Sequence, residues 1–284
     1  MSEEHRAPLF ITGISLWSPG YASLAAFVKD DRDESVIDCV SPWVPARLGR
    51  GSSRLTRMLG EVAAAATSSA GASPDTVATV YGSALGEIET MILLLDAIWR
   101  GDGQLSPMRF KNSVHNAAGG LGSIGTANRA FSTAIAAGPR SFEASLLEAA
   151  AWLWDQSTDE GPKTAVVAVA DDQVPEPLAT LCPRIGLAVG LCLSTAGGAA
   201  ALGVISHLRT QPQPRTIPTS YFGRELPHGL LTNPAAAGLA LLEAVVERRS
   251  GTVPLAFSVQ RPLAVDLVAG ARAWDDAAAA SANT

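Results

Sequence analysis

Short apolar runs rich in β-branched residues alternate with longer helical patterns over the first 170 residues of the chain. The short runs are bounded by Gly, Pro or polar residues and predict buried strands, whereas the longer segments repeat apolar residues every three or four positions and predict helices. Such alternation is typical of an α/β fold in which helices cover a sheet. The predicted strands are residues 9–14, 76–81, 132–137 and 164–170, and the predicted helices are residues 24–28, 55–70, 87–99, 117–127 and 141–154.

The composition allows a large core and argues against several classes of function. Of the 284 residues, 47% are hydrophobic and 17% are charged, which suits one large domain or two modest ones. The net charge of −6 argues against nucleic-acid binding, which needs a basic stripe, but it leaves room for a small basic patch that meets an acidic partner. Cys39, Cys182 and Cys192 are too scattered for a disulfide framework or a zinc site, so we expect neither a metal nor a cofactor.

The uncharged stretch of 22 residues at 185–206 is long enough to cross a bilayer. Its five glycines and the polar pair Ser194-Thr195 favour instead a hairpin of two buried strands joined by a Gly-rich turn. The first residues of the chain are charged, and no apolar signal-peptide core follows them. We therefore expect no membrane span and a cytoplasmic location.

Two segments of small residues in the middle of the chain carry the functional interpretation. Residues 113–120, Ser-Val-His-Asn-Ala-Ala-Gly-Gly, place His115 and Asn116 before a run of small residues, which alone indicates the start of a helix. Residues 131–149 predict a strand, a tight turn at Gly138 and a helix. Nucleophile elbows have this shape, because the turn exposes one side chain at the positive end of a helix.

These segments resemble those of the β-ketoacyl synthases, in which an Asn-Ala-Ala segment precedes a Thr-rich strand and then Ala-Cys-Xaa-Ser-Gly at the start of a helix. Asn116 begins the first motif in this chain. Counting back from Ala144 aligns Ser141 with the family's Gly, and Gly138 with its nucleophilic Cys. The similarity covers roughly residues 9–205, and residues 113–118 look most similar to ketosynthase-like proteins of aryl-polyene-type pigment pathways.

The resemblance implies that the catalytic groups of the family are absent. In the family a cysteine thiolate takes the growing acyl chain, and two histidines, or a His and an Asn, stabilise the enolate and the oxyanion. Gly138 has no side chain that could form a thioester. Residues 231–239 resemble the family's histidine segment, but alignment on Gly238 puts Thr232 at the catalytic His position, and His228 lies four residues earlier. No residue is therefore assigned a catalytic role.

The resemblance also implies a fold and a partner. We expect a thiolase-like layered α/β fold, with residues 1–205 as a largely complete N-terminal half and residues 206–284 as a truncated C-terminal segment with a frayed tail. Such a subunit pairs with a catalytic ketosynthase, works with an acyl carrier protein, and acts as a chain-length factor in fatty acid or polyketide (aryl-polyene-like) biosynthesis. The residues expected at the interface and the acyl tunnel are Met108, Phe110, Val114, His115 and Asn116.

Two other functions stay open from the sequence. One is an active ketosynthase-like acyltransferase that uses His115 or Cys182 in an unexpected arrangement. The other is a stand-alone module that binds acyl chains or carrier proteins and never pairs with a ketosynthase. The solubility of the isolated chain distinguishes these two functions from that of a degenerate subunit. A degenerate subunit would expose a large apolar interface and aggregate without its partner.

Overall fold

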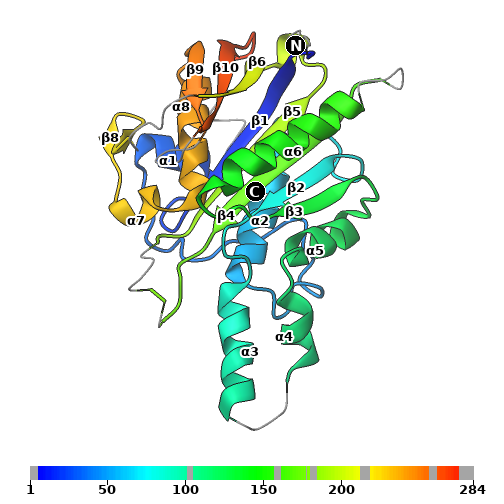
Figure 1. Cartoon of the computed structure of the whole chain (residues 1–284), viewed down its shortest axis with the longest axis vertical. Helices are drawn as coiled ribbons and strands as arrows, with labels where there is room; N and C mark the ends of the chain where they lie inside the picture. Colours follow the sequence, from blue (N-terminus) through cyan, green and yellow to red (C-terminus); the bar gives the residue numbers. More distant parts are fainter. Residues whose placement is uncertain are drawn as a thin grey trace.

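The computed structural model describes residues 6–100, 105–156, 161–176, 178–179, 184–211, 218–255 and 261–274. Within them, eight strands form one sheet in the order β3-β2-β4-β5-β1-β6-β10-β9 (Figure 1). Strand β2 is parallel to β3 and β4, and the other pairs are antiparallel. The strands are β1 Leu9–Trp17, β2 Ala78–Gly82, β3 Ser132–Ile135, β4 Thr164–Asp171, β5 Leu187–Ser194, β6 Gly203–Thr210, β9 Gly251–Pro254 and β10 Leu263–Ala269, and β7 Ser220–Tyr221 pairs separately with β8 Arg224–Glu225.

Helices cover both faces of this sheet. Helix α6 lies across one face, where its Phe142, Leu146 and Leu153 join a core cluster, and α2 packs on the opposite face (Figure 1). The α-helices are α1 Leu24–Lys29, α2 Arg54–Ser69, α3 Ile88–Arg100, α4 Pro107–Asn112, α5 Ala117–Thr126, α6 Ser141–Asp155, α7 His228–Leu231 and α8 Leu239–Val246, and the 3-10 turns are η1 Gly138–Arg140, η2 Gly198–Ala200 and η3 Pro234–Gly238.

Strand β4 is buried on both of its faces, which explains why residues 164–170 are apolar without alternation. Its alternate residues Val167 and Val169 enter the cluster on the α6 side, while Val166 and Ala168 enter the cluster on the α2 side. A strand covered on both faces is apolar at every position, as the Thr-Ala-Val-Val-Ala-Val-Ala run predicts. This confirms the prediction that residues 164–170 form a buried strand of the main sheet.

The α/β fold expected from the sequence is confirmed, but the expected hairpin at residues 185–206 is wrong. Strands β5 and β6 both form, yet β1 lies between them and pairs with each. The glycines at 197 and 198 therefore lie in a connection that passes over the end of β1, not in a hairpin turn.

The C-terminal part of the chain extends the same sheet. Strand β6 crosses residue 205, where the sequence placed the end of the N-terminal half, and β10 and β9 continue the sheet beyond it. The tail expected to fray lies, from residue 275 on, outside the described residues. No described helix is long and apolar enough to cross a membrane.

Helices α3 and α4 form an arm that projects from the body of the molecule (Figure 1). The base of the arm is held at Glu87, whose buried carboxylate accepts hydrogen bonds from Ser53, Thr56 and Thr90 at 2.7, 2.7 and 3.3 Å. Ser53 also caps the N-terminus of α2. These contacts fix the start of α3 against the start of α2.

Candidate functional site

The elbow predicted at Gly138 is present. Strand β3 ends at Ile135, a 3-10 turn runs from Gly138 to Arg140, and α6 begins at Ser141. Gly138 has a φ of +56°, in the left-handed region that favours glycine, and a Cβ built on it would meet nothing within 4 Å. The turn thus faces open space at the N-terminal end of a 15-residue helix, but it presents no side chain there.

Hydrogen bonds within the turn hold this geometry. The Ser141 hydroxyl donates to the Gly138 carbonyl at 2.8 Å and accepts from the Ala137 amide at 3.2 Å. Arg140 donates from Nε to the buried carboxylate of Glu143 at 2.6 Å, one turn into the helix. The elbow is therefore rigid, because three of its residues are tied to each other or to the first turn of α6.

The second segment that resembles the family's catalytic motifs lies beside the elbow. Turn η3 packs against η1 and α6, and a Cβ on Gly238 would lie only 2.7 Å from the Phe142 ring. Thr232 is exposed, and its hydroxyl donates to the His228 carbonyl at 3.1 Å, a helix-capping contact. His228 is exposed at the start of α7. The structure brings the two segments together, and the residues that align with the catalytic ones include neither a thiol nor an imidazole.

The described cysteines are not arranged as nucleophiles. Burial raises the pKa of the Cys39 thiol and raises that of Cys192 to about 12, so both stay protonated near neutral pH. Cys182 lies outside the described residues. Among the described residues no group of three or more His, Cys, Asp or Glu side chains could hold a metal ion.

The expected interface residues lie on α4 and on the turn into α5. Met108, Phe110 and Val114 are 50%, 64% and 46% exposed, high values for large apolar side chains. His115 is half-buried, and Asn116 is exposed. His115 and Asn116 line a cavity of about 480 Å³ together with Gly119, Gly120 and Ser123 of α5 and Ser132, Thr133 and Ala134 of β3. The structure thus brings His115 and Asn116 to the strand that leads into the elbow.

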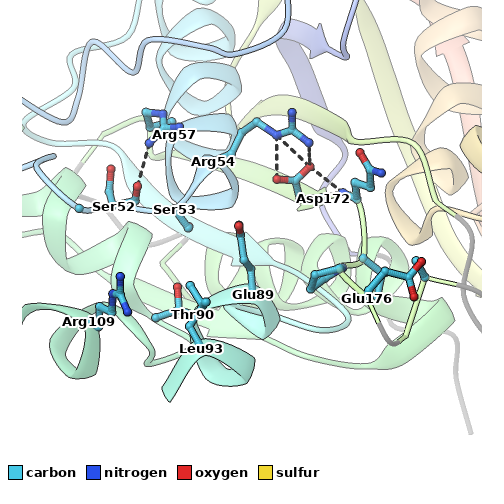
Figure 2. A pocket seen from close by; sticks show the side chains of 15 residues that line it. Ser52, Ser53, Arg54, Arg57, Glu89, Thr90, Leu93, Arg109, Asp172 and Glu176 are labelled. Carbon is cyan, nitrogen blue, oxygen red and sulfur yellow. Dashed lines mark hydrogen bonds and ion pairs between the residues drawn. The ribbon is translucent and has the colours of Figure 1, made fainter. Parts of the chain in front are cut away.

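A larger cavity, of about 610 Å³, lies between the start of α2, α3, α4 and the segment after β4 (Figure 2). In it Arg54 binds Asp172 through both Nε and Nη2, at distances of 2.6–3.0 Å. Arg57 bonds to Asp38 at 2.8 Å, whereas the Arg109 guanidinium, on the α4 side of the cavity, has no partner among the described residues. No local pattern predicts this site, because Arg54 and Asp172 are 118 residues apart in the chain.

The sequence also left Asp171 without a role, although two acidic residues directly after a buried strand are a recognisable signal. The Asp171 carboxylate accepts from the amides of Ala84 and Leu85 at 2.9 and 3.1 Å and from the Ser83 hydroxyl at 3.0 Å. Burial raises its pKa, while these hydrogen bonds and the nearby Arg184 oppose that shift. Asp171 thereby fixes the loop that leads from β2 to the arm.

Solved structures with a similar fold include ketosynthases and their complexes. One is a ketosynthase in complex with its chain length factor from Xenorhabdus doucetiae, with a TM-score of 0.65, 20% identity, and coverage of 92% of this chain and 98% of that chain. The ishigamide ketosynthase/chain length factor has a TM-score of 0.54, 18% identity, and coverage of 72% and 67%. A β-ketoacyl synthase from Burkholderia phymatum STM815 has a TM-score of 0.54, 13% identity, and coverage of 76% and 67%.

At these identities the structures establish the fold, and they confirm the thiolase-like α/β architecture expected from the sequence. No curated protein matches the chain. The model of the β-ketoacyl synthase N-terminal domain matches residues 26–252, a range that contains the elbow, α6 and η3. The chain belongs to the β-ketoacyl synthase family.

Proposed function

We propose that this chain is the non-catalytic, chain-length-factor-type partner of a β-ketoacyl-acyl carrier protein synthase. The observation that carries the proposal is the elbow at Gly138: its turn, its helix and its open space are present, and the side chain that would take the acyl group is not. A thioester intermediate needs a nucleophile at that position. The chain therefore acts through its surface and its shape, in complex with a subunit that supplies the chemistry.

The surface proposed for pairing is centred on β3. This strand is the first in the sheet order, so only one of its edges is paired, with β2. An unpaired edge is a ready site for another chain, and the glycines of α5 beside it allow close approach, since a Cβ on Gly120 would meet nothing within 4 Å. The cavity between α5 and β3 gives such a partner room at this edge.

The proposed effect on chain length comes from the side chains next to this edge. Met108 and Phe110 on α4 and Val114 in the turn into α5 present apolar surface to solvent, directly before His115 and Asn116 in the chain. Apolar groups of this size suit the wall of a tunnel that holds a growing acyl chain. The Ser-Val-His-Asn-Ala-Ala segment favours fatty acid or polyketide products of the aryl-polyene type. Carrier-protein thioesters are made in the cytoplasm, so the pair would work there.

The arginines near the start of α2 support an acyl carrier protein as the second partner. Arg54 and Arg57 are neutralised by Asp172 and Asp38. Arg47, Arg50 and Arg109 are exposed and make no side-chain ion pair or hydrogen bond within the part of the chain that the structure covers. Free arginines of this kind attract an acidic protein and speed its association, although the chain as a whole is acidic.

Co-expression with the ketosynthase encoded nearest to this chain tests the pairing. We expect the two to elute together from a size-exclusion column as a one-to-one complex, and this chain alone to aggregate because its interface is exposed. A monodisperse chain that never joins any neighbouring ketosynthase would overturn the proposal and favour a stand-alone module.

A further inference from the structure

The imidazole ring of His115 rests on the loop that follows β2. Residues 83–86 (the 83–86 loop) come directly after β2 and end at Gly86, whose φ is +57°. A Cβ built on Gly86 would lie only 2.6 Å from Nδ1 of His115 and 3.4 Å from its Cε1. The ring therefore packs directly on the Gly86 backbone, 29 residues earlier in the chain, and position 86 has no room for a side chain.

One buried carboxylate holds the whole 83–86 loop. The Asp171 carboxylate, at the end of β4, accepts a hydrogen bond from the Ser83 hydroxyl at 3.0 Å. It also accepts from the backbone amides of Ala84 and Leu85, at 2.9 and 3.1 Å. The Ser83 hydroxyl in turn accepts from the Gly86 amide at 2.9 Å. All four residues of the loop are thus tied to Asp171, either directly or through Ser83.

Asp171 is itself fixed from its other side. Its backbone carbonyl accepts from the Asn233 side-chain amide at 2.8 Å, and its carboxylate lies 3.6 Å from the Arg184 guanidinium. The residue is 2% exposed, so water cannot readily replace these partners. A shift of the 83–86 loop would break buried hydrogen bonds, each of which is costly to leave unmade. Asp171 is therefore a firm anchor for the loop.

His115 connects this anchor to the site proposed for pairing. The residue touches Gly86 and also lines the cavity of about 480 Å³ between α5 and the unpaired edge of β3. The backbone of Gly86 limits how far the ring can withdraw from the cavity. The position of the 83–86 loop consequently sets how much of the cavity the ring fills.

We infer that Asp171 is a positioning residue for the pairing site: through the 83–86 loop it holds the His115 ring and so keeps the cavity open for the ketosynthase. The inference rests on the proposed pairing, and it adds a buried residue that does not line the cavity. Hydrogen-bonded and closely packed groups transmit a displacement because the protein interior has little free space to absorb it. A change at Asp171 therefore reaches the pairing site through His115.

Gly86→Ala tests the contact without removing any hydrogen bond. The added methyl group has to displace the His115 ring, and we expect the pair with the ketosynthase to weaken by about tenfold. Gly71→Ala is the matched control, because Gly71 has a similar φ of +64° but a Cβ there would meet nothing within 4 Å. Both variants carry the same backbone strain, so equal weakening by the two would overturn the inference.

Two substitutions of Asp171 test the anchor. Asp171→Ala removes every acceptor for the 83–86 loop and should weaken the pair as Gly86→Ala does. Asp171→Asn keeps one side-chain oxygen, which can still accept from Ser83 and Leu85, so it should bind the ketosynthase nearly as tightly as the wild type. Equal binding by Asp171→Ala and the wild type would contradict the positioning role. If Asp171→Ala does not fold, Gly86→Ala decides the question.

Nuclear magnetic resonance of the chain labelled with ¹³C-histidine gives a readout that needs no partner. The ring signal of His115, assigned by its loss in His115→Gln, should shift in Gly86→Ala and Asp171→Ala, whereas the signals of His207 and His228 should not. If the His115 signal does not move, the inference is wrong and the proposed function stands. If the wild type pairs with no ketosynthase, the proposed function fails and the role in pairing fails with it, while the signal still decides whether Asp171 holds His115.

Discussion

Asn233 donates a hydrogen bond from its side-chain amide to the backbone carbonyl of Asp171 at 2.8 Å, across 62 residues of sequence. The same amide donates to the Ile185 carbonyl at 2.9 Å, and its oxygen accepts from the Ala235 amide at 3.0 Å. Asn233 is buried, so all three contacts lie away from water. One side chain thus ties η3, which packs against η1 and α6, to the end of β4 and to the segment before β5.

Asn233→Ala is expected to destabilise the fold by roughly 3 kcal/mol, because it leaves two buried carbonyls and one amide without a partner. Urea unfolding followed by circular dichroism measures the change. Asn116→Ala is the control, since Asn116 is exposed and its side chain makes no capping bond. Equal stability of the two variants would show that water replaces the lost contacts.

The chain should take no acyl group from acyl carrier protein thioesters. Gly138 offers no nucleophile, and burial keeps the Cys39 and Cys192 thiols protonated. Intact-mass spectrometry after incubation with acyl donors detects any adduct. A stable acyl group on a cysteine would contradict the non-catalytic function and revive the acyltransferase alternative.

Gly138→Cys should create a thiol that reacts faster than an ordinary exposed cysteine. The open space at the elbow leaves the thiol accessible, and the N-terminus of α6 lowers its pKa. Gly198→Cys is a matched control, because Gly198 also has positive φ and open space but begins a 3-10 turn that no α-helix follows. Iodoacetamide labelling at pH 7 compares the two rates. Equal rates would mean that the helix has no influence at this turn.

Changing the proposed tunnel residues should alter product length and leave the pair intact. Phe110→Ala enlarges the space beside the partner and is expected to lengthen the products, whereas Val114→Trp fills it and is expected to shorten them. Mass spectrometry of products from the reconstituted pair gives the distribution. If both variants still pair and the distribution does not change, these residues do not line the tunnel.

Glu61 should make stability depend on pH. Burial raises the pKa of its carboxyl from 4.5 to about 7, so folding favours the protonated form. The stabilisation is complete below pH 4.5 and is lost as the pH rises through 7. Glu61→Gln removes this dependence. Its free energy of unfolding, relative to that of the wild type, should therefore rise by about 2 kcal/mol as the pH goes from 5.5 to 8. Glu34→Gln, at an exposed position, should follow the wild-type curve.

The sequence predicted those elements whose signal is local. Strand β4 and helix α2 are read from runs of apolar and Ala-rich residues, and the elbow is read from a strand, a turn and a helix in immediate succession. The wrong hairpin at residues 185–206 has a non-local cause. Which strand lies beside β5 depends on β1, more than 170 residues earlier, and no pattern within the stretch specifies it.

The candidate site also contains features that the sequence predicts and features that only the structure shows. The position of Gly138 at a turn between a strand and a helix follows from the family resemblance, because the motifs keep their order along the chain. The packing of this turn against η3 is seen only in the structure. The pair of Arg54 and Asp172 joins residues far apart, so only the structure finds it. The exposed face of α3 was visible as a helical pattern, but a sequence pattern does not distinguish a face that packs on the core from one that remains uncovered.

A residue other than glycine at position 138 would strain the backbone of the elbow. Any residue with a Cβ is disfavoured at the φ of +56° that Gly138 adopts, by about 1 kcal/mol, whereas glycine adopts it freely. Enzymes commonly tolerate such strain because reactivity requires it. In this chain glycine occupies the turn, so the elbow keeps its left-handed conformation without that strain.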